Sequence, residues 1–182
     1  MFSRDTAKPR MVKTAKFKAV LTKSPNESGW HFIPVEAKIA NKFRMTDGSR
    51  RVVCTINGDV SFQCALMPWG DIFTIIVNKG KRDKLGIIAG DKISVELRAD
   101  ESKYGLPMPE ELQEVLNQDQ DGDEFFHSLT AGKQRSILYF IGKIKDVDKR
   151  IHTALIFVEH LKKNDGKIVG DQLQEELKRP IF

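Results

Sequence analysis

The spacing of apolar residues changes near residue 100 of the chain. Before Asp100, apolar and polar residues alternate in short segments, and this period of two is typical of half-buried β-strands. Turn residues such as Asn57-Gly58, Pro68-Trp69-Gly70 and Gly90-Asp91 separate the segments. The predicted strands cover residues 17–21, 30–33, 52–56, 60–66, 72–77 and 93–97, and short helices are expected at 35–43 and 80–85. Six short strands predict a small β-barrel or sandwich.

The turn at Asn57-Gly58 leaves two strand registers to weigh. A two-residue loop pairs Ile56 with Asp59 and mixes apolar and polar side chains on one face. A loop that also contains Asp59 pairs Ile56 with Val60 and puts one continuous apolar set on a single face. We favour the second register, with a bulge, because it gives the hairpin one face to bury.

Cys54 and Cys64 are too few for a disulfide framework or a four-ligand zinc site. The favoured register pairs Cys54 with Phe62 and Cys64 with Val52, so the two thiols are diagonal neighbours and not directly opposite. We therefore expect two buried free thiols.

Beyond residue 100 the apolar residues recur at helical spacing. A linker is expected at 101–108, where Gly105 and Pro107 oppose regular structure, between an N-terminal domain at 13–100 and a helical domain at 109–182. Pro109, Thr130 and Asp146 are in positions that favour helix starts. The predicted helices begin at 109, cover 123–129, follow residues 130 and 146, and cover 172–178. The class is therefore α+β, a small barrel followed by helices.

Composition is that of a soluble globular protein. The chain has 182 residues, of which 40% are hydrophobic and 30% charged, and it contains no apolar run long enough to cross a membrane. Residues 1–12 have no apolar core after their charges, so we expect a disordered N-terminus, no secretory signal and a cytoplasmic location.

Charge is uneven between the two halves. Residues 1–100 carry 18 Lys and Arg against 10 Asp and Glu, whereas residues 101–182 carry 12 against 15. The densest basic cluster is in the predicted helix at 80–85 and just before it, and we take six positive residues as tentative ligand or partner contacts: Arg50, Arg51, Lys79, Lys81, Arg82 and Lys84. Trp30, Trp69 or Tyr104 would offer a stacking face if exposed. The alternative interpretation is a solvated helix flank.

Patterns that carry catalysis or hold cofactors are weak. Asp119 to Asp123 alternates oxygen ligands like a calcium loop, but Glu124 stands where glycine is needed and Thr130 where a bidentate acid is needed. It is better interpreted as a solvated loop between helices. The four histidines lack metal-binding spacing, the pairs Glu110-Glu111 and Glu175-Glu176 look like caps and solvated faces, and no GxSxG, GxGxxG or P-loop is present. We expect no metal, no cofactor and no enzymatic activity.

Several turns carry a family resemblance in the first half of the chain. They are Gly29-Trp30, Ile33-Pro34, Thr55-Ile56-Asn57-Gly58, Asn78-Lys79, Gly90-Asp91 and the exit Asp100-x-Ser102-x-Tyr104-Gly105. Residues 17–100 resemble a bacterial family that is described only as a domain of unknown function with a small split β-barrel. The Gly90-Asp91 turn also resembles that of double-split barrels of the AbrB and MazE type, which include DNA-binding folds.

A second resemblance covers residues 107–163. It rests on Pro109-Glu110-Glu111-Leu112, Phe126, Leu129-Thr130, Ile141, Lys145, Arg150 and Ala154. These residues resemble the YdeI/OmpD-associated, or bacteriocin-protection, helical domain, which often follows the first one. Of that family's basic positions, Lys145 and Arg150 carry over, and with Tyr104 they mark a second tentative site. The resemblance implies a non-catalytic role in stress tolerance or envelope protection.

Three classes of function stay open at this point. The first is a binding module for a protein or a small anionic ligand, which we favour. The second is a nucleic-acid-binding regulator that uses the basic barrel, and it predicts binding that falls steeply with salt. The third is an enzyme whose site the linear sequence hides. The oligomeric state and the partner do not follow from the sequence.

Overall fold

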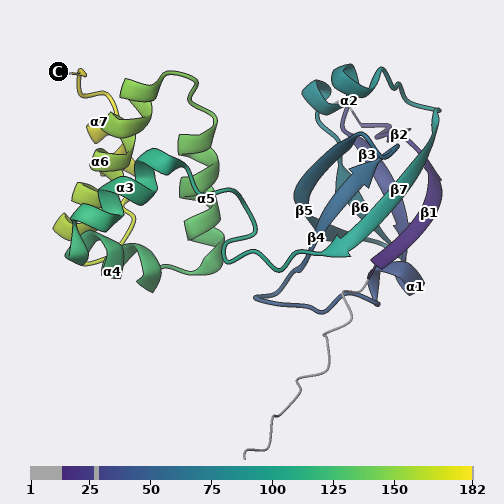
Figure 1. Cartoon of the computed structure of the whole chain (residues 1–182), viewed down its shortest axis with the longest axis horizontal. Coiled ribbons are helices and arrows are strands. Elements are labelled where there is room, and N and C mark those ends of the chain that lie inside the picture. The colour runs from purple at the N-terminus through teal and green to yellow at the C-terminus, as the bar shows by residue number, and fades with distance from the viewer. Residues whose placement is uncertain (1–13, 27–28, 182) are drawn as a thin grey trace, which may run out of the picture. The chain divides into compact units, whose positions relative to one another are not determined.

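The computed structural model describes residues 14–26 and 29–181, and in it the chain divides into two compact units. The first ends at Glu101 and contains the sheet, and the second begins at Ser102 and is helical (Figure 1). The N-terminus expected to be disordered, residues 1–12, lies outside the described residues.

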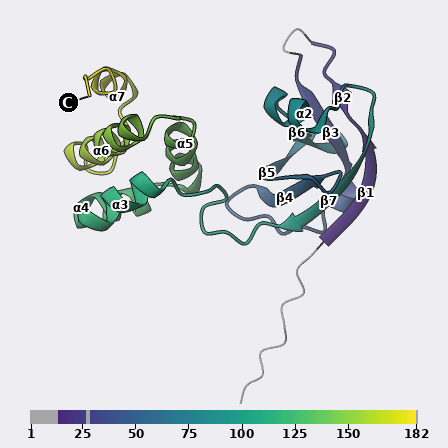
Figure 2. The same cartoon turned by 45° about the horizontal axis from the view of Figure 1, so that its top comes forward.

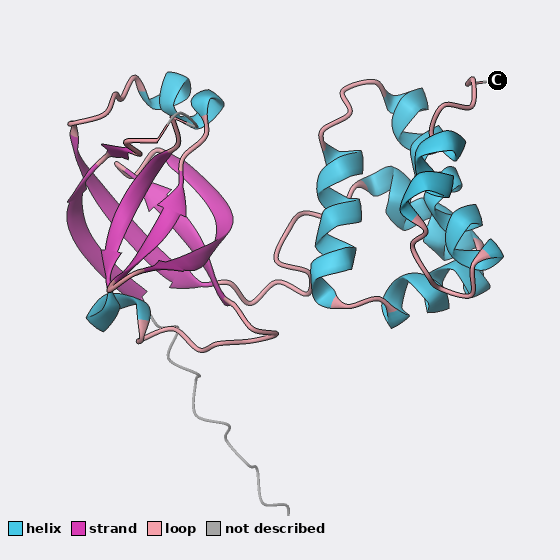
Figure 3. Ribbon diagram, turned by 180° about the vertical axis from the view of Figure 1, so that it is seen from behind, coloured by secondary structure: helices cyan, strands magenta, loops and turns pink. Residues whose placement is uncertain are grey.

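The first unit is an antiparallel sheet that curls around its own core. Its strand order is β1-β7-β4-β5-β6-β3-β2, and β1 also approaches β3, as Figures 1 and 2 show. Two short helices lie at opposite ends of the curled sheet (Figure 3). The elements are β1 (Thr14–Val20), β2 (Thr22–Lys23), β3 (His31–Glu36), α1 (Ala37–Ala40), β4 (Arg50–Ile56), β5 (Val60–Trp69), β6 (Ile72–Ile76), α2 (Lys79–Leu85) and β7 (Lys92–Ala99).

The β4–β5 hairpin confirms the second of the two registers, the one that puts its apolar residues on a single face. Ile56 pairs with Val60 across a loop of Asn57, Gly58 and Asp59. Asn57 and Gly58 both have positive φ, of 52° and 71°, which Asn and Gly adopt more easily than other residues. The Asn57 side chain also accepts the backbone N–H of Ser94 on β7 at 2.9 Å, so the turn is fixed to a third strand.

Inward-facing residues alternate along each strand and form the core of the first unit. On β4 these are Val52, Cys54 and Ile56, and on β7 they are Ile93, Val95 and Leu97. The six predicted strands are all present. Each of them buries only one face, and this is why apolar and polar residues alternate along their sequences.

Two local expectations for the first unit are wrong. The helix predicted at 35–43 is only α1, because β3 continues through Pro34 to Glu36 in pairing with β6. Pro68 and Trp69 belong to β5 and pair with Phe73 and Ile72, so the turn begins after them. Tertiary pairing thus overrides the local turn signal of proline.

The two cysteines are free, and one of them is less buried than expected. Cys54 is buried, whereas Cys64 is half-buried. The pKa of the Cys54 thiol is raised above its ordinary value by the neighbouring Cys64 thiol and then by burial. Cys54 is therefore the less reactive of the two.

The second unit consists of five helices among the described residues. They are α3 (Glu110–Gln118), α4 (Gln120–Ser128), α5 (Ala131–Gly142), α6 (Val147–Lys163) and α7 (Gly170–Glu176). In three of these helices the side chain of the N-cap residue accepts a backbone N–H of the first turn. Asp119 accepts the amide of Gly122, Thr130 that of Lys133, and Asp146 that of Lys149. The segment at 119–123, expected to be a solvated loop, is therefore the start of α4.

Helix α6 has two apolar stripes. Ala154, Val158 and Leu161 are buried in the core of the second unit. Ile151 and Leu155 belong to the other stripe and are exposed. Helix α6 packs on α3, α4, α5 and α7, and these neighbours cover the first stripe but leave the second one open.

The structure confirms the α+β class, a curled antiparallel sheet followed by helices. Of the helices in the described part of the chain, none is long and apolar enough to cross a lipid bilayer.

Candidate functional site

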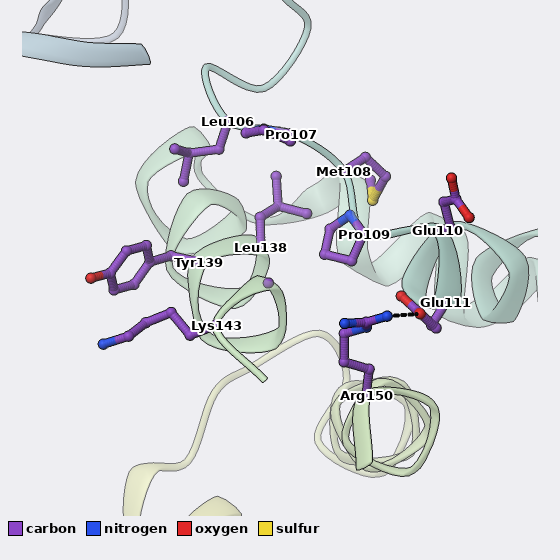
Figure 4. Close-up of a pocket in the computed structure, with 11 residues that line it drawn as sticks. Leu106, Pro107, Met108, Pro109, Glu110, Glu111, Leu138, Tyr139, Lys143 and Arg150 are labelled. Carbon is purple, nitrogen blue, oxygen red and sulfur yellow. Dashed lines mark ion pairs between the residues drawn. The ribbon is translucent and has the colours of Figure 1, made fainter. Parts of the chain in front are cut away.

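A pocket of about 600 Å³ opens within the helical unit, between the segment before α3, helix α5 and the start of α6 (Figure 4). Its lining is mostly apolar, with Glu110, Glu111 and Arg150 on one side and Lys143 on the other (Figure 4). The lining residues are Leu106, Pro107, Met108, Pro109, Glu110, Glu111, Leu138, Tyr139, Gly142, Lys143 and Arg150. Pockets of this size and character are typical of ligand-binding sites.

The apolar wall follows from the sequence of the segment that precedes α3. Pro107 and Pro109 favour an extended chain, and Pro109 is the N-cap residue of α3 with extended dihedral angles. Leu106 and Met108 are half-buried and pack against the core of the helical unit. The segment expected as a linker thus contributes one wall of the pocket, and Leu138 of α5 contributes another (Figure 4).

An ion pair between Arg150 and Glu111 closes one side of the pocket. The Nη2 atom of Arg150 lies 2.6 Å from Oε1 of Glu111, and both side chains are largely buried. The Nη1 atom donates to the carbonyl oxygens of Ile144 at 3.0 Å and Lys145 at 3.4 Å, at the end of the loop after α5. Arg150 therefore holds together the start of α3, the loop after α5 and the start of α6.

This ion pair fixes the charge state of the pocket wall. The hydrogen bond from the Arg150 guanidinium lowers the pKa of Glu111, and the same contact raises the pKa of Arg150. Both groups are charged at neutral pH, and Nη1 and Nη2 of Arg150 already have partners.

Tyr139 of α5 and Lys143, which directly follows this helix, form the mouth of the pocket, and their side chains point away from Leu138 and Pro109 (Figure 4). Lys143 Nζ lies 4.9 Å from the centre of the Tyr139 ring, a cation–π contact. Tyr139 is 57% exposed. The mouth therefore offers an aromatic face and an ammonium group to a bound molecule.

The structure does not bring the predicted basic residues of the first unit into one surface. Arg50 and Arg51 are consecutive on β4, so their side chains point to opposite faces of the sheet. Arg50 bonds Asn41 and lies over the Phe73 ring. Lys81 lies over the ring of Phe62. Phe62 is four residues along β5 from Leu66, the residue that pairs with Arg50, and four residues of a β-strand span about 13 Å.

Of the basic residues at 79–84, Lys79 is paired within α2. Lys79 Nζ is 2.6 Å from Asp83 Oδ2, one turn further along the helix. Arg82 is half-buried and Lys84 is exposed. The two tryptophans are both exposed, and Trp69 packs against Phe32 with ring centres 4.9 Å apart.

Of the second tentative site, only Arg150 lines the pocket. The Tyr104 hydroxyl lies 2.8 Å from Nε2 of His127, and its ring packs against Phe126, so Tyr104 belongs to the contact with α4. Lys145 contributes its carbonyl oxygen to Arg150, and its side chain is exposed. Within residues 14–26 and 29–181, no cluster of three or more His, Cys, Asp and Glu side chains could hold a metal ion.

Sequence reasoning did not point to Tyr139, Gly142 and Lys143, nor to Glu111 beyond its place in a helix start. The two prolines at 107 and 109 could have indicated the pocket. They favour an extended chain, and an extended apolar segment that lies beside helices leaves room between its side chains. Pairing Glu111 with Arg150 needs the packing of α3 on α6, which no local pattern gives.

The structure is that of an α+β protein whose helical unit contains a mostly apolar pocket with an ion pair in its wall. Residues 17–97 match the family model described as "Domain of unknown function (DUF1905)", and residues 106–164 match the one described as "Bacteriocin-protection, YdeI or OmpD-Associated". The two matches follow each other along the chain, one in each unit, as in a fusion of the two kinds of domain. All residues that line the pocket lie within the second match. Among curated proteins, none matches the chain.

Proposed function

We propose that the chain is a non-catalytic binding protein and that its helical unit receives an apolar group of a partner in the pocket at 106–150. The observation that carries the proposal is the pocket itself, which combines proline, leucine and methionine side chains with a mouth formed by Tyr139 and Lys143. Such a surface favours an aliphatic or aromatic group, and Lys143 favours an anionic substituent beside it.

The state of the charged groups supports binding over catalysis. A general acid or base works best with a pKa near the working pH. The pKa of Glu111 is instead lowered by Arg150, and Arg150 already donates to two carbonyl oxygens and one carboxylate. These residues are suited to shape and orient one wall of the pocket, not to transfer protons.

The family of the helical unit supports a role in protection against bacteriocins. In this proposal protection is an indirect effect, because binding of a partner requires no reaction of the bacteriocin itself. The first unit then acts as a second folded module beside the binding unit.

Two glycines of α5 provide a matched test of the pocket. Gly142 lines it, and a Cβ atom there would lie 3.9 Å from Pro109 Cγ, an ordinary contact, so the backbone accepts a side chain and Gly142→Leu is expected to occupy the space. Gly132 lies on the same helix with nothing within 4 Å of such a Cβ, so Gly132→Leu is the control.

The experiment is a screen of small aromatic and aliphatic carboxylates against the ¹⁵N-labelled full chain by NMR. We expect binding compounds to shift the amide signals of residues 106–111 and 138–143, and we expect Gly142→Leu but not Gly132→Leu to abolish the shifts. Compounds that shift these signals equally in both variants, or an absence of binding compounds for the wild-type chain, would overturn the proposal.

A further inference from the structure

A second hollow of the helical unit is a groove of about 730 Å³ between α3 and α6. Its floor is apolar and consists of Val115 from α3 and of Ile151, Leu155 and Val158 from α6. Ile151 is 40% and Leu155 is 44% exposed. The two residues are four positions apart and therefore lie one above the other along the helix, and the exposed Val147 continues the stripe by one turn. Three apolar side chains in a row on an open face indicate an interaction surface.

The rim of this groove is acidic. Its charged residues are Glu110, Glu111, Glu114, Asp119, Glu159 and Lys162. Three of the carboxylates have a cationic partner, in the pairs Glu111–Arg150, Asp119–Lys162 and Glu159–Arg179, at 2.6 to 3.0 Å.

The negative charge of the rim is permanent and only partly compensated. Hydrogen bonds from Arg150 and Lys162 lower the pKa of Glu111 and Asp119, so both stay ionised at neutral pH. Glu110 and Glu114 form no ion pair with any residue that the structure describes. Glu114 accepts only an amide hydrogen bond from Gln118 on its own helix, at 2.6 Å. Two carboxylates beside an apolar floor are thus available to a positively charged partner.

We propose that the α3–α6 groove docks a basic amphipathic helix of a partner protein. The apolar residues of such a helix recur at three and four positions, which matches the spacing of Val147, Ile151 and Leu155. Lysine or arginine beside this stripe then faces Glu110 and Glu114. From Val147 to Leu155 the stripe on α6 rises by about 12 Å, so two to three turns of a partner helix fill it.

The charge of the rim selects against two other occupants. An acidic helix is repelled by the same carboxylates. A second copy of this chain, docked through a twofold axis, brings the two acidic rims together, because a symmetric interface uses the same patch on both subunits. The groove shares Glu110 and Glu111 with the pocket at 106–150 but has its own apolar floor, and docking there does not require a ligand in that pocket.

The test uses a fluorescein-labelled synthetic peptide of about 14 residues, made of leucine and lysine with leucine at helical spacing. Its binding to the full chain is followed by fluorescence anisotropy. We expect saturable binding that weakens with salt, and we expect little binding of a leucine–glutamate peptide or of the leucine–lysine peptide in scrambled order.

Two pairs of variants locate the peptide on the chain. Leu155→Glu is expected to weaken binding about tenfold or more, because it places a carboxylate in the apolar floor. Its control is Val20→Glu, at a residue of β1 that is 42% exposed and thus matches Leu155. Glu114→Lys is expected to weaken binding about fivefold, whereas Glu124→Lys has no effect. Glu124 is a fair control, because it is also exposed and accepts a hydrogen bond from a glutamine on its own helix.

Several results would overturn the proposal. One is equal binding of the scrambled or the leucine–glutamate peptide. Another is an equal effect of Glu114→Lys and Glu124→Lys, which would place the peptide elsewhere. A dimer in sedimentation velocity that Leu155→Glu dissociates would make the groove a self-association surface. Gly142→Leu fills the pocket but does not touch the groove, so peptide binding that survives this substitution supports the groove even if the pocket proposal is wrong. The two proposals can therefore be refuted separately.

Discussion

The buried carboxylate of Glu176 joins the last helix to the helical unit. Its Oε2 atom lies 2.6 Å from Nδ1 of His160, and its Oε1 atom accepts from Gln172 at 2.9 Å. The backbone N–H of Val169 donates to Nε2 of His160 at 3.0 Å, so the ring carries its proton on Nδ1 and donates it to Glu176. Replacing Glu176 by Gln keeps the shape and removes the charge that all these donors face.

The size of the effect follows from the pKa of this carboxyl group. Hydrogen bonds from Gln172 and His160, with Lys163 nearby, lower the pKa of Glu176 from 4.5 to about 2. At about 1.4 kcal/mol per unit, the ionised form contributes about 3 kcal/mol to the free energy of unfolding at neutral pH. Because the folded-state pKa is the lower one, this contribution is complete above pH 4.5 and is lost as the pH falls through about 2.

The assay is urea unfolding of the full chain, followed by circular dichroism at 222 nm, which reports mainly on the helical unit. We expect Glu176→Gln to lower the free energy of unfolding by about 2 to 3 kcal/mol at pH 7. The difference from wild type should shrink toward pH 3. Glu175→Gln is the matched control, since that side chain is exposed and pairs only with Lys178, and it should cost about 0.5 kcal/mol or less. Equal losses in the two variants, or a difference that does not change with pH, would refute this account of how α7 is held.

Three further predictions concern single sites. Gly122→Ala should destabilise the chain by about 1 to 3 kcal/mol in the same urea assay, because a Cβ there overlaps Cγ1 of the buried Val158; a neutral effect would contradict the packing of α4 on α6. Cys64 should react with a thiol reagent in the native chain before Cys54 does, as read by mass spectrometry of labelled peptides; equal rates would mean that the difference in burial is wrong. Lys81→Glu should lower the stability by about 1 kcal/mol, because the ammonium lies 4.5 Å from the ring centre of Phe62; an unchanged melting temperature would show that this contact contributes nothing.

The sheet unit could be predicted from the sequence in some detail. Each strand buries one face, so the alternation of apolar residues marks both the strands and the inward side. Even the register at Asn57 follows, because only one pairing gives the hairpin an apolar face. The prediction fails where pairing with a distant strand decides, as at Pro34 and Pro68, which lie inside strands.

The helical unit, which carries the candidate site, is harder to predict, because the environment of each side chain depends on how the helices pack. Glu176 has the local signature of a solvated acid near a helix end, yet it is buried against His160, sixteen residues earlier. Likewise, Ile151 and Leu155 follow the helical period of the core residues on α6, but the packing of the neighbouring helices leaves them exposed. The periodicity of a sequence shows which positions of a helix are apolar. It does not show which of these positions a neighbouring helix covers.

The basic cluster of the first unit shows a similar limit. Its charges are dense in sequence, yet Lys79 pairs with Asp83 and Lys81 packs over an aromatic ring. Nucleic-acid binding by this unit therefore stays a prediction that salt-dependent binding would test.

The central claim, that the pocket at 106–150 holds a partner, is tested most directly by capture from native lysate on the immobilised full chain. Wild type, Gly142→Leu and Gly132→Leu are compared, with and without nuclease treatment. We predict that wild type and Gly132→Leu retain the same partner whether or not nuclease is added, and that Gly142→Leu loses it. Capture that depends on intact nucleic acid, or that Gly142→Leu leaves unchanged, would contradict the account.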